Sequence, residues 1–188
     1  MNVFKIVITL TFLVISSHSF ALTDADRGIF DLIFTAPEVA EPSDQKSPIQ
    51  CAIHFVDIQD ARDNKETIGA SGSKPLRARA VDNWLQQYKS DILDQLPYDP
   101  DKQKIDINVE LLRMYSYAQG ASIRGVVAAK LSLESENVNE VIFLRGYSSR
   151  TNWNNLTGEY ADAVNKAGYD LALTIEDTLR EHCSDGGA

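Results

Sequence analysis

The alternation of apolar and polar residues over 105–111 constrains the fold more than any other feature. Isoleucine, valine and leucine occupy every second position there, with charged or amide side chains between them, which is typical of a strand buried on one face. Further strand-like runs at 123–133 and 141–147 follow turns at 117–121 and 137–139. Pairing the runs so that their apolar residues share one face predicts three consecutive antiparallel strands.

One more strand and two helices complete the pattern. Residues 50–58 are rich in β-branched and aromatic side chains and predict a strand. Apolar residues recur at three- and four-residue steps over 75–96 and 157–182, which indicates two amphipathic helices. The resulting β-α-β-β-β-α order predicts an α+β fold, a two-layer α/β sandwich in which a four-stranded mixed sheet carries both long helices on one face. We expect a single domain over residues 49–188.

The first 21 residues have the pattern of an export signal. Lys5 precedes a nearly unbroken apolar run at 6–15, and Ser19 and Ala21 provide a small-x-small cleavage site. The run is shorter than the ~20 apolar residues that a membrane-spanning helix needs. No cysteine stands directly after this run, so the lipid-attachment site of a bacterial lipoprotein is missing. We expect signal peptide 1–21 to be removed, which leaves a soluble periplasmic or secreted protein without a stable membrane anchor.

An N-terminal arm and a proline-rich linker occupy residues 22–48. The apolar stripe at 29–33 predicts one or two helical turns. Residues 36–48 contain three of the six prolines and are typical of an extended linker. We expect the arm to dock loosely and to cover part of the domain.

The two cysteines lie 132 positions apart, both after the signal peptide. In an oxidising compartment such a pair most simply forms one disulfide, Cys51–Cys183. Two buried free thiols or a metal site are the alternatives, although no CxxC or HxxxH spacing supports a metal site. A disulfide would tie the start of the first strand to the end of the last helix.

The charge balance and the absence of catalytic motifs exclude several functions. With 18 basic and 27 acidic residues the chain has a net charge of −9, which argues against generic binding of DNA, RNA or anionic lipid. The sequence contains no P-loop, dinucleotide-binding, serine-hydrolase or zinc-protease motif. His54 and His182 have no serine or cysteine at a suggestive spacing. We therefore expect no catalytic residue, no cofactor, no metal and no enzymatic activity.

The densest polar cluster follows the first strand. Its acids lack the spacing of a calcium-binding loop. It is either a strand exit with Asx turns and an internal Arg62 ion pair, or a loop that faces a partner. The candidate partner-loop residues are Asp57, Asp60, Arg62 and Asp63. A second mixed patch after the last strand consists of Arg145, Tyr147, Arg150 and Trp153.

The second face of the predicted sheet needs a cover. In the expected register Leu131 pairs with Phe143. An apolar half-face then lies away from the helices. Its candidate docking residues are Leu112, Met114, Val126, Ile142 and Leu144. Either the arm at 29–34 covers this half-face, or it is a docking surface for an envelope protein or a second copy of the chain.

Three features carry a resemblance to a known family: the run Phe-Val-Asp-Ile-Gln-Asp-Ala-Arg at 55–62, the Ile68-Gly69 pair and the helix that contains Trp84. Together they resemble the YajG-type envelope lipoproteins, and the element order is similar to that of small envelope accessory proteins. The chain departs from that family in lacking a lipidation cysteine and in having a cysteine pair. The resemblance implies a non-enzymatic periplasmic accessory domain.

The leading expectation is an exported accessory or interaction protein of the bacterial cell envelope, without catalytic activity. Two alternatives stay open. The protein could bind a small molecule or lipid in a groove between the helices and the sheet. It could instead be an enzyme that uses the polar loop at 57–66.

Overall fold

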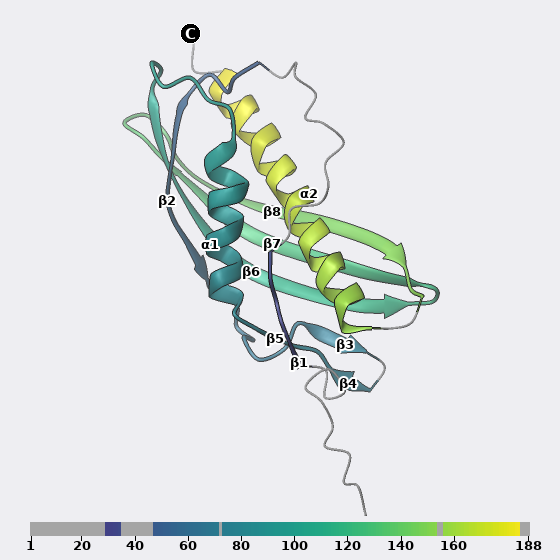
Figure 1. Cartoon of the computed structure of the whole chain (residues 1–188). Coiled ribbons are helices and arrows are strands. Elements are labelled where there is room, and N and C mark those ends of the chain that lie inside the picture. Colours follow the sequence, from purple (N-terminus) through teal and green to yellow (C-terminus); the bar gives the residue numbers. More distant parts are fainter. Residues whose placement is uncertain (1–28, 35–46, 72, 154–155, 185–188) are drawn as a thin grey trace, which may run out of the picture.

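The computed structural model describes residues 29–34, 47–71, 73–153 and 156–184. The predicted signal peptide and most of the predicted linker lie outside the described residues. In chain order the elements are β1 (Ile29–Asp31), β2 (Ala52–Asp60), β3 (Gly69–Ser71), β4 (Lys74–Pro75), β5 (Arg77–Arg79), α1 (Val81–Asp91), η1 (Leu93–Gln95), β6 (Lys104–Gln119), β7 (Ser122–Glu134), β8 (Asn139–Thr151) and α2 (Thr157–Ser184). Figure 1 shows two layers, with both helices in front of the large sheet.

The large sheet has six strands in the order β4-β3-β6-β7-β8, and β2 also pairs with β6. β2 runs parallel to the first half of β6. β3 pairs with the same strand further along, at Ser116 and Tyr117. β6, β7 and β8 form the predicted antiparallel unit. The predicted strand-helix-strand-strand-strand-helix pattern is present, but the prediction of four strands is wrong, because the short strands β3 and β4 extend the sheet.

The extra strands form where the sequence predicts a loop and the start of a helix. Ile68 and Leu76 are buried, so the chain between them folds back along the edge of the sheet. The N–H of Ile68 donates to the carbonyl of Leu76 at 2.8 Å, and the N–H of Leu76 donates to Gly69 at 2.9 Å. Gly69 has φ 127°, and a Cβ atom there would lie 1.8 Å from the carbonyl oxygen of Ser116. Only glycine fits this position, and α1 begins later than predicted.

Both helices pack on the same face of the sheet (Figure 1), with α1 against β2 and α2 against β7 and β8. Two glycines let α2 approach the strands closely. A Cβ atom on Gly125 would lie 2.1 Å from the carbonyl oxygen of Ala163, and one on Gly146 would lie 2.0 Å from that of Ala167. The backbone of α2 therefore rests directly on β7 and β8.

The described part of the arm packs on the helix layer. Residues 29–31 form β1, a strand parallel to β5 in a separate two-stranded sheet, so the predicted helical turns are wrong. Pairing with β5 satisfies backbone hydrogen-bonding groups of this segment, which in a helix would have to bond within the segment. The Phe34 ring meets Trp84 and Tyr88 edge-on, with centroid distances of 5.6 and 5.5 Å. Residues 29–34 therefore cover the helix layer and not the far face of the sheet.

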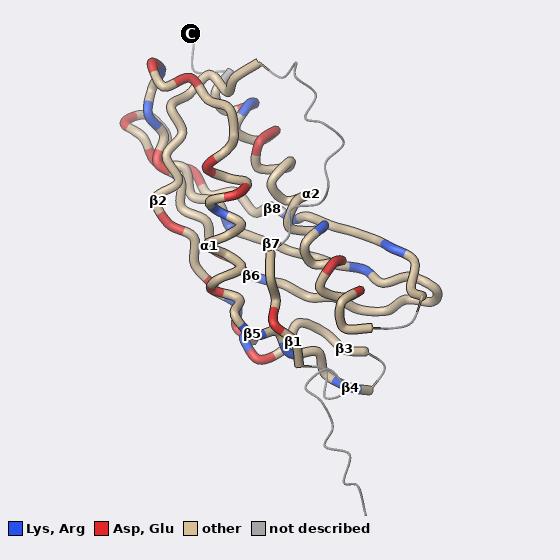
Figure 2. The backbone as a smooth tube through the Cα atoms, viewed as in Figure 1, with Lys and Arg blue, Asp and Glu red and all other residues tan. Residues whose placement is uncertain are grey.

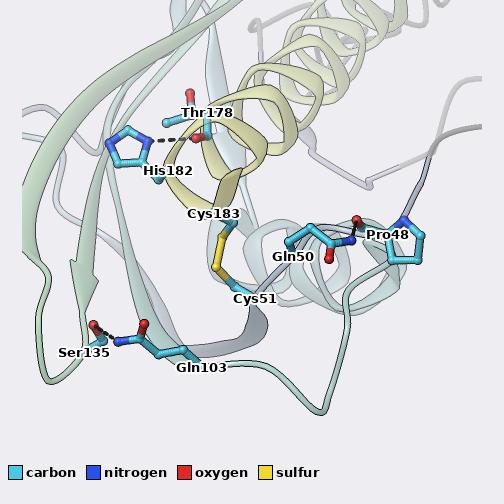
Figure 3. Close-up of a disulfide and its surroundings, with 8 residues drawn as sticks. All are labelled: Pro48, Gln50, Cys51, Gln103, Ser135, Thr178, His182 and Cys183. Atoms are coloured by element: carbon cyan, nitrogen blue, oxygen red, sulfur yellow. Dashed lines mark hydrogen bonds between the residues drawn. A yellow bond between two sulfur atoms is a disulfide. The ribbon is translucent and has the colours of Figure 1, made fainter. Parts of the chain in front are cut away.

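Cys51 and Cys183 form a disulfide bond with a Cα–Cα distance of 5.6 Å (Figure 3). Both residues are buried. The bond joins the residue that precedes β2 to the last turn of α2. It therefore closes the fold between its first long strand and its last helix.

Candidate functional site

The outer face of the sheet, which lies opposite both helices, carries the exposed large apolar side chains of β6–β8. Gly125 and Gly146 face α2. Because side chains alternate along a strand, the residues next to them point away from the helices. The exposed side chains are Tyr115, Val141, Phe143 and Tyr147. Phe143 is the most exposed of them, at 71%, so this face is not packed as a core.

The register of β8 moves two predicted docking residues to the helix side. Leu131 pairs with Ile142 and not with Phe143. A shift of one residue turns every side chain of a strand to the opposite face. Ile142 and Leu144 therefore pack against the hydrophobic core, and their placement on the outer face is wrong.

A β-bulge in β6, between Leu111 and Arg113, moves a third predicted docking residue to the helix side. After the bulge Met114 points toward the helices and is 3% exposed, so its predicted place on the outer face is wrong. Leu112 is the extra residue of the bulge and is half-buried. Val126 does lie on the outer face, but it is buried.

Three arginines and three tyrosines occupy three adjacent cross-strand rows of this outer face. We call this surface the Arg–Tyr face. Its members are Arg113, Tyr115, Tyr117, Arg124, Arg145 and Tyr147. Each row across β6, β7 and β8 contributes two of them, and the remaining positions are Ala128, Val126 and Ser149. The three rows contain no acidic residue, although the chain as a whole has a net charge of −9.

Contacts within the Arg–Tyr face leave its positive charges available. The rings of Tyr115 and Tyr117 stack with centroids 5.9 Å apart. Cζ of Arg124 lies 5.9 Å from the centroid of the Tyr147 ring, a cation–π distance. Nε of Arg124 is buried and has no hydrogen-bond partner in the described part of the chain. The arginines of this face form no ion pair with any described residue.

The opposite end of the outer face is acidic, and two of its carboxylates are paired within the molecule. Asp106 lies 2.8 Å from Nζ of Lys104 and 2.7 Å from Nδ1 of His54, and Lys130 donates to Glu110 at 2.8 Å. The hydrogen bonds from Lys104 and then from His54 hold the pKa of the Asp106 carboxyl below its usual range. Figure 2 shows acidic positions gathered at this end, where β6 begins and β7 ends. Glu134, the cross-strand neighbour of Asp106, is exposed and forms no ion pair with a described residue, so the unpaired charge is negative at this end and positive on the Arg–Tyr face.

The second mixed patch divides between the two faces. Arg145 and Tyr147 belong to the Arg–Tyr face. Arg150 points to the helix side and forms an ion pair with Asp162 of α2. Trp153, just beyond β8, is 76% exposed. The sequence therefore indicates this patch correctly only in part, because neighbouring positions on a strand face opposite ways.

The predicted partner loop is in large part structural. Asp57 lies in β2, and its carboxylate accepts the N–H of Ile58 at 2.8 Å. Arg62 donates from Nε and Nη2 to the two carboxylate oxygens of Asp60, both at 2.8 Å. These two side chains are 3% and 6% exposed, so the predicted internal ion pair is present and is buried. Of the four predicted residues, Asp57 and Asp63 are exposed.

We expect Asp60→Asn to lower the free energy of unfolding by about 3 kcal/mol at pH 7, because it leaves the buried Arg62 guanidinium without a charge partner. Burial opposes ionisation of Asp60, but the hydrogen bonds and charge of Arg62 outweigh it and lower the pKa of the carboxyl. Its stabilisation is therefore complete above the unfolded-state pKa of about 4 and is lost as the pH falls through the lower folded-state value.

Urea unfolding of the wild type and Asp60→Asn at several pH values measures this effect. The difference between the two proteins should be largest at neutral pH and should shrink as the pH falls below about 4. Asp63→Asn, a change of the same kind at an exposed carboxylate nearby, should have little effect at either pH. A constant difference across the pH range would contradict this role of Asp60.

A cleft of about 260 Å³ connects this loop with the Arg–Tyr face. Asn64 and Thr67 from the loop line it, together with Arg113 and Tyr115 from the sheet. Arg62 also lines the cleft, and its Nη1 atom is buried without a hydrogen-bond partner among the described residues. The walls thus combine two guanidinium groups and the carboxylate of Asp63 with amide and hydroxyl groups.

Side chains fill the space between the helices and the sheet. Trp84 and Tyr88 stack with centroids 5.3 Å apart, and Nε1 of Trp84 donates to Asn165 of α2 at 2.7 Å. Tyr160 is fully buried and belongs to the same core. Burial raises the pKa of the Tyr88 hydroxyl well above its usual range. The hypothesis of a small-molecule-binding protein requires a groove between the helices and the sheet. These core side chains lie in that space.

Both described histidines contact a carboxylate. His54 contacts Asp106, and His182 lies 2.9 Å from Glu140 and 2.8 Å from the carbonyl oxygen of Thr178. In the described ranges, no three His, Cys, Asp or Glu side chains gather as a metal site would require. No helix of the described chain is long and apolar enough to cross a membrane.

No protein-family model matches the sequence, and no curated protein matches it. Among solved structures, the chain is similar to a Caulobacter crescentus protein that is described provisionally as a lipoprotein. The two are 9% identical with a TM-score of 0.41, over 72% of this chain and 92% of that one. A likeness of this extent does not establish membership of the YajG-type family.

Proposed function

We propose that this chain is an exported interaction protein of the bacterial cell envelope, without catalytic activity, and that it binds a partner protein through the outer face of its sheet. One observation carries the proposal: no described element covers that face, and it exposes Phe143 and two tyrosines. Exposed apolar and aromatic side chains that share one face mark interaction sites in soluble proteins.

The sequence supports export. A basic residue, an apolar run and a small-x-small site occupy the first 21 residues. The Cys51–Cys183 disulfide fits an oxidising compartment outside the cytoplasm. Residues Asp60 and Arg62 of the polar loop are used to hold the loop itself, which favours an interaction protein over an enzyme that uses this loop.

Site-specific photo-cross-linking in cells tests the proposal. A photoreactive amino acid in place of Phe143 should give a discrete adduct with a partner, whereas one in place of Leu173 should not. Leu173 is a matched control because it is an exposed apolar residue of α2, in the helix layer. Neither replacement should change the free energy of unfolding by more than about 0.5 kcal/mol, since both side chains are exposed.

A second substitution tests whether the adduct forms through the outer face. Tyr115→Asp should abolish the Phe143 adduct, because both side chains lie on the outer face. Tyr98→Asp, at a tyrosine of similar exposure near the start of β2, should leave the adduct unchanged. Equal adducts from positions 143 and 173, or an adduct that survives Tyr115→Asp, would contradict the proposal.

A further inference from the structure

We propose that the Arg–Tyr face recognises an acidic, extended segment of the partner protein. This inference rests on the proposed function and specifies the chemistry of the ligand. Its basis is charge: Arg113, Arg124 and Arg145 share three rows that contain no acidic residue and have no ion-pair partner in the described chain. A carboxylate that approached them would form charge-assisted hydrogen bonds with the guanidinium groups.

The arrangement suits a ligand with both charge and apolar groups. Tyr115 and Tyr147 occupy the row between the two rows that contain arginine, and Ala128 lies between Arg113 and Arg145 on the middle strand. Tyrosine and arginine are enriched at protein interfaces because they combine large contact area with directed polar groups. Nε of Arg124 is buried and has no partner among the described residues, so a bound acceptor would satisfy a hydrogen-bond donor that is otherwise unused.

The cleft beside the loop offers an independent indication at one end of the face. Arg113 and Tyr115 line both the cleft and the Arg–Tyr face. Arg62, whose side chain is 3% exposed, also lines it, and the Nη1 atom of Arg62 has no hydrogen-bond partner within the described residues. A carboxylate seated in the cleft would meet two guanidinium groups, from Arg62 and Arg113, and one like charge, from Asp63. The cleft could therefore hold one acidic side chain while the rest of the segment crosses the tyrosines.

The size and surroundings of the face favour a peptide segment over a membrane surface. Rows on one face of a strand are ~7 Å apart and neighbouring strands ~4.8 Å apart, so the three rows span roughly 14 by 10 Å. Four or five extended residues cover that distance. An anionic membrane would extend past the face toward the acidic positions of a chain whose net charge is −9, and would be repelled there.

Titration with defined peptides tests the inference. The probes are an eight-residue peptide of alternating glutamate and valine and its lysine–valine counterpart, each followed by amide chemical shifts of the folded protein. We expect the acidic peptide to shift signals of β6–β8 on the Arg–Tyr face, and the basic peptide to shift none of them. The affinity should fall as salt is raised, because the attraction is electrostatic.

Two double variants identify the charges responsible. Arg113→Gln/Arg145→Gln should weaken the acidic peptide about tenfold or more. Arg77→Gln/Lys102→Gln removes the same charge at exposed positions away from the face and should leave the affinity unchanged. Equal binding to both double variants, or binding only to vesicles of anionic phospholipid, would overturn the inference.

The same variants separate this inference from the proposed function. If the cross-link from position 143 persists undiminished in Arg113→Gln/Arg145→Gln, the face binds a partner but not through acidic groups, and only the inference fails. If the cross-link itself is absent in the wild type, the proposed function fails. Loss of both the cross-link and the peptide affinity in the arginine variant, with unchanged thermal unfolding, supports both.

Discussion

Replacing Gly146 with alanine should destabilise the domain by about 3 kcal/mol or more, and we expect Gly125→Ala to have a comparable effect. In each case the new methyl group would lie within 2.1 Å of a backbone carbonyl oxygen of α2. Backbone atoms of a helix cannot yield as a flexible side chain does, so the whole of α2 would have to lift away from β7 and β8. Chemical denaturation of the purified protein measures the loss.

Gly158→Ala is the matched control for this prediction. Gly158 is also in α2, but no atom lies within 4 Å of a Cβ placed there. Alanine favours a helix by up to about 1 kcal/mol over glycine, so this variant should be as stable as the wild type or slightly more stable. A Gly146→Ala protein as stable as Gly158→Ala would contradict the direct packing of α2 on β8.

Removing the disulfide is the other change with a large expected effect. The bond closes a loop over a sequence separation of 132 residues. For a loop of that length the chain-entropy model gives about 5 kcal/mol of stabilisation, most of it through the unfolded state. We expect Cys51→Ala/Cys183→Ala to lose most of that amount, since alanine suits two buried positions and leaves no unpaired polar group.

Reduction provides the internal control. Dithiothreitol should lower the denaturation midpoint of the wild type toward that of the double alanine variant. The variant itself should not respond to the reductant, because it has no thiol left. A wild-type midpoint that does not move on reduction would show that the bond contributes little to the stability of this fold.

The long elements could be predicted from the sequence because each has its own period. Residues 105–111 alternate, and 157–182 repeat at helical spacing, so strand and helix are distinguishable locally. Single-residue register is a different problem. The bulge at Leu112 and the pairing of Leu131 with Ile142 each move side chains to the opposite face. Apolar residues occur on both sides of β8, so its sequence is compatible with either register.

The short strands could not be predicted because tertiary contacts determine them. Gly69 to Ser71 has little strand propensity, and it pairs with β6 because Ile68 and Leu76 are buried beside it. The same is true of β1, whose partner β5 lies almost fifty residues further along the chain. A helix from Pro75 is locally reasonable, but the burial of Leu76 outweighs that preference.

The Arg–Tyr face became visible only once the register was known. Its members come from three strands, and no two of them are adjacent in sequence. The alternation of Arg113, Tyr115 and Tyr117 is a signal that the sequence does contain. This alternation indicates a strand with arginine and tyrosine side chains on one side. The pairing that brings Arg124 and Arg145 beside it depends on the register of β7 and β8, which this alternation does not determine.

Tyrosine labelling in intact cells tests the central claim, that a partner covers the outer face, most directly. Tyr147 on that face and Tyr98 near the start of β2 are 41% and 42% exposed, so a tyrosine-modifying reagent should label both equally in the purified protein. In cells, mass spectrometry should find Tyr147 protected while Tyr98 is labelled as before. Equal labelling of Tyr147 and Tyr98 in cells would show that the outer face is uncovered there and would contradict the proposed function.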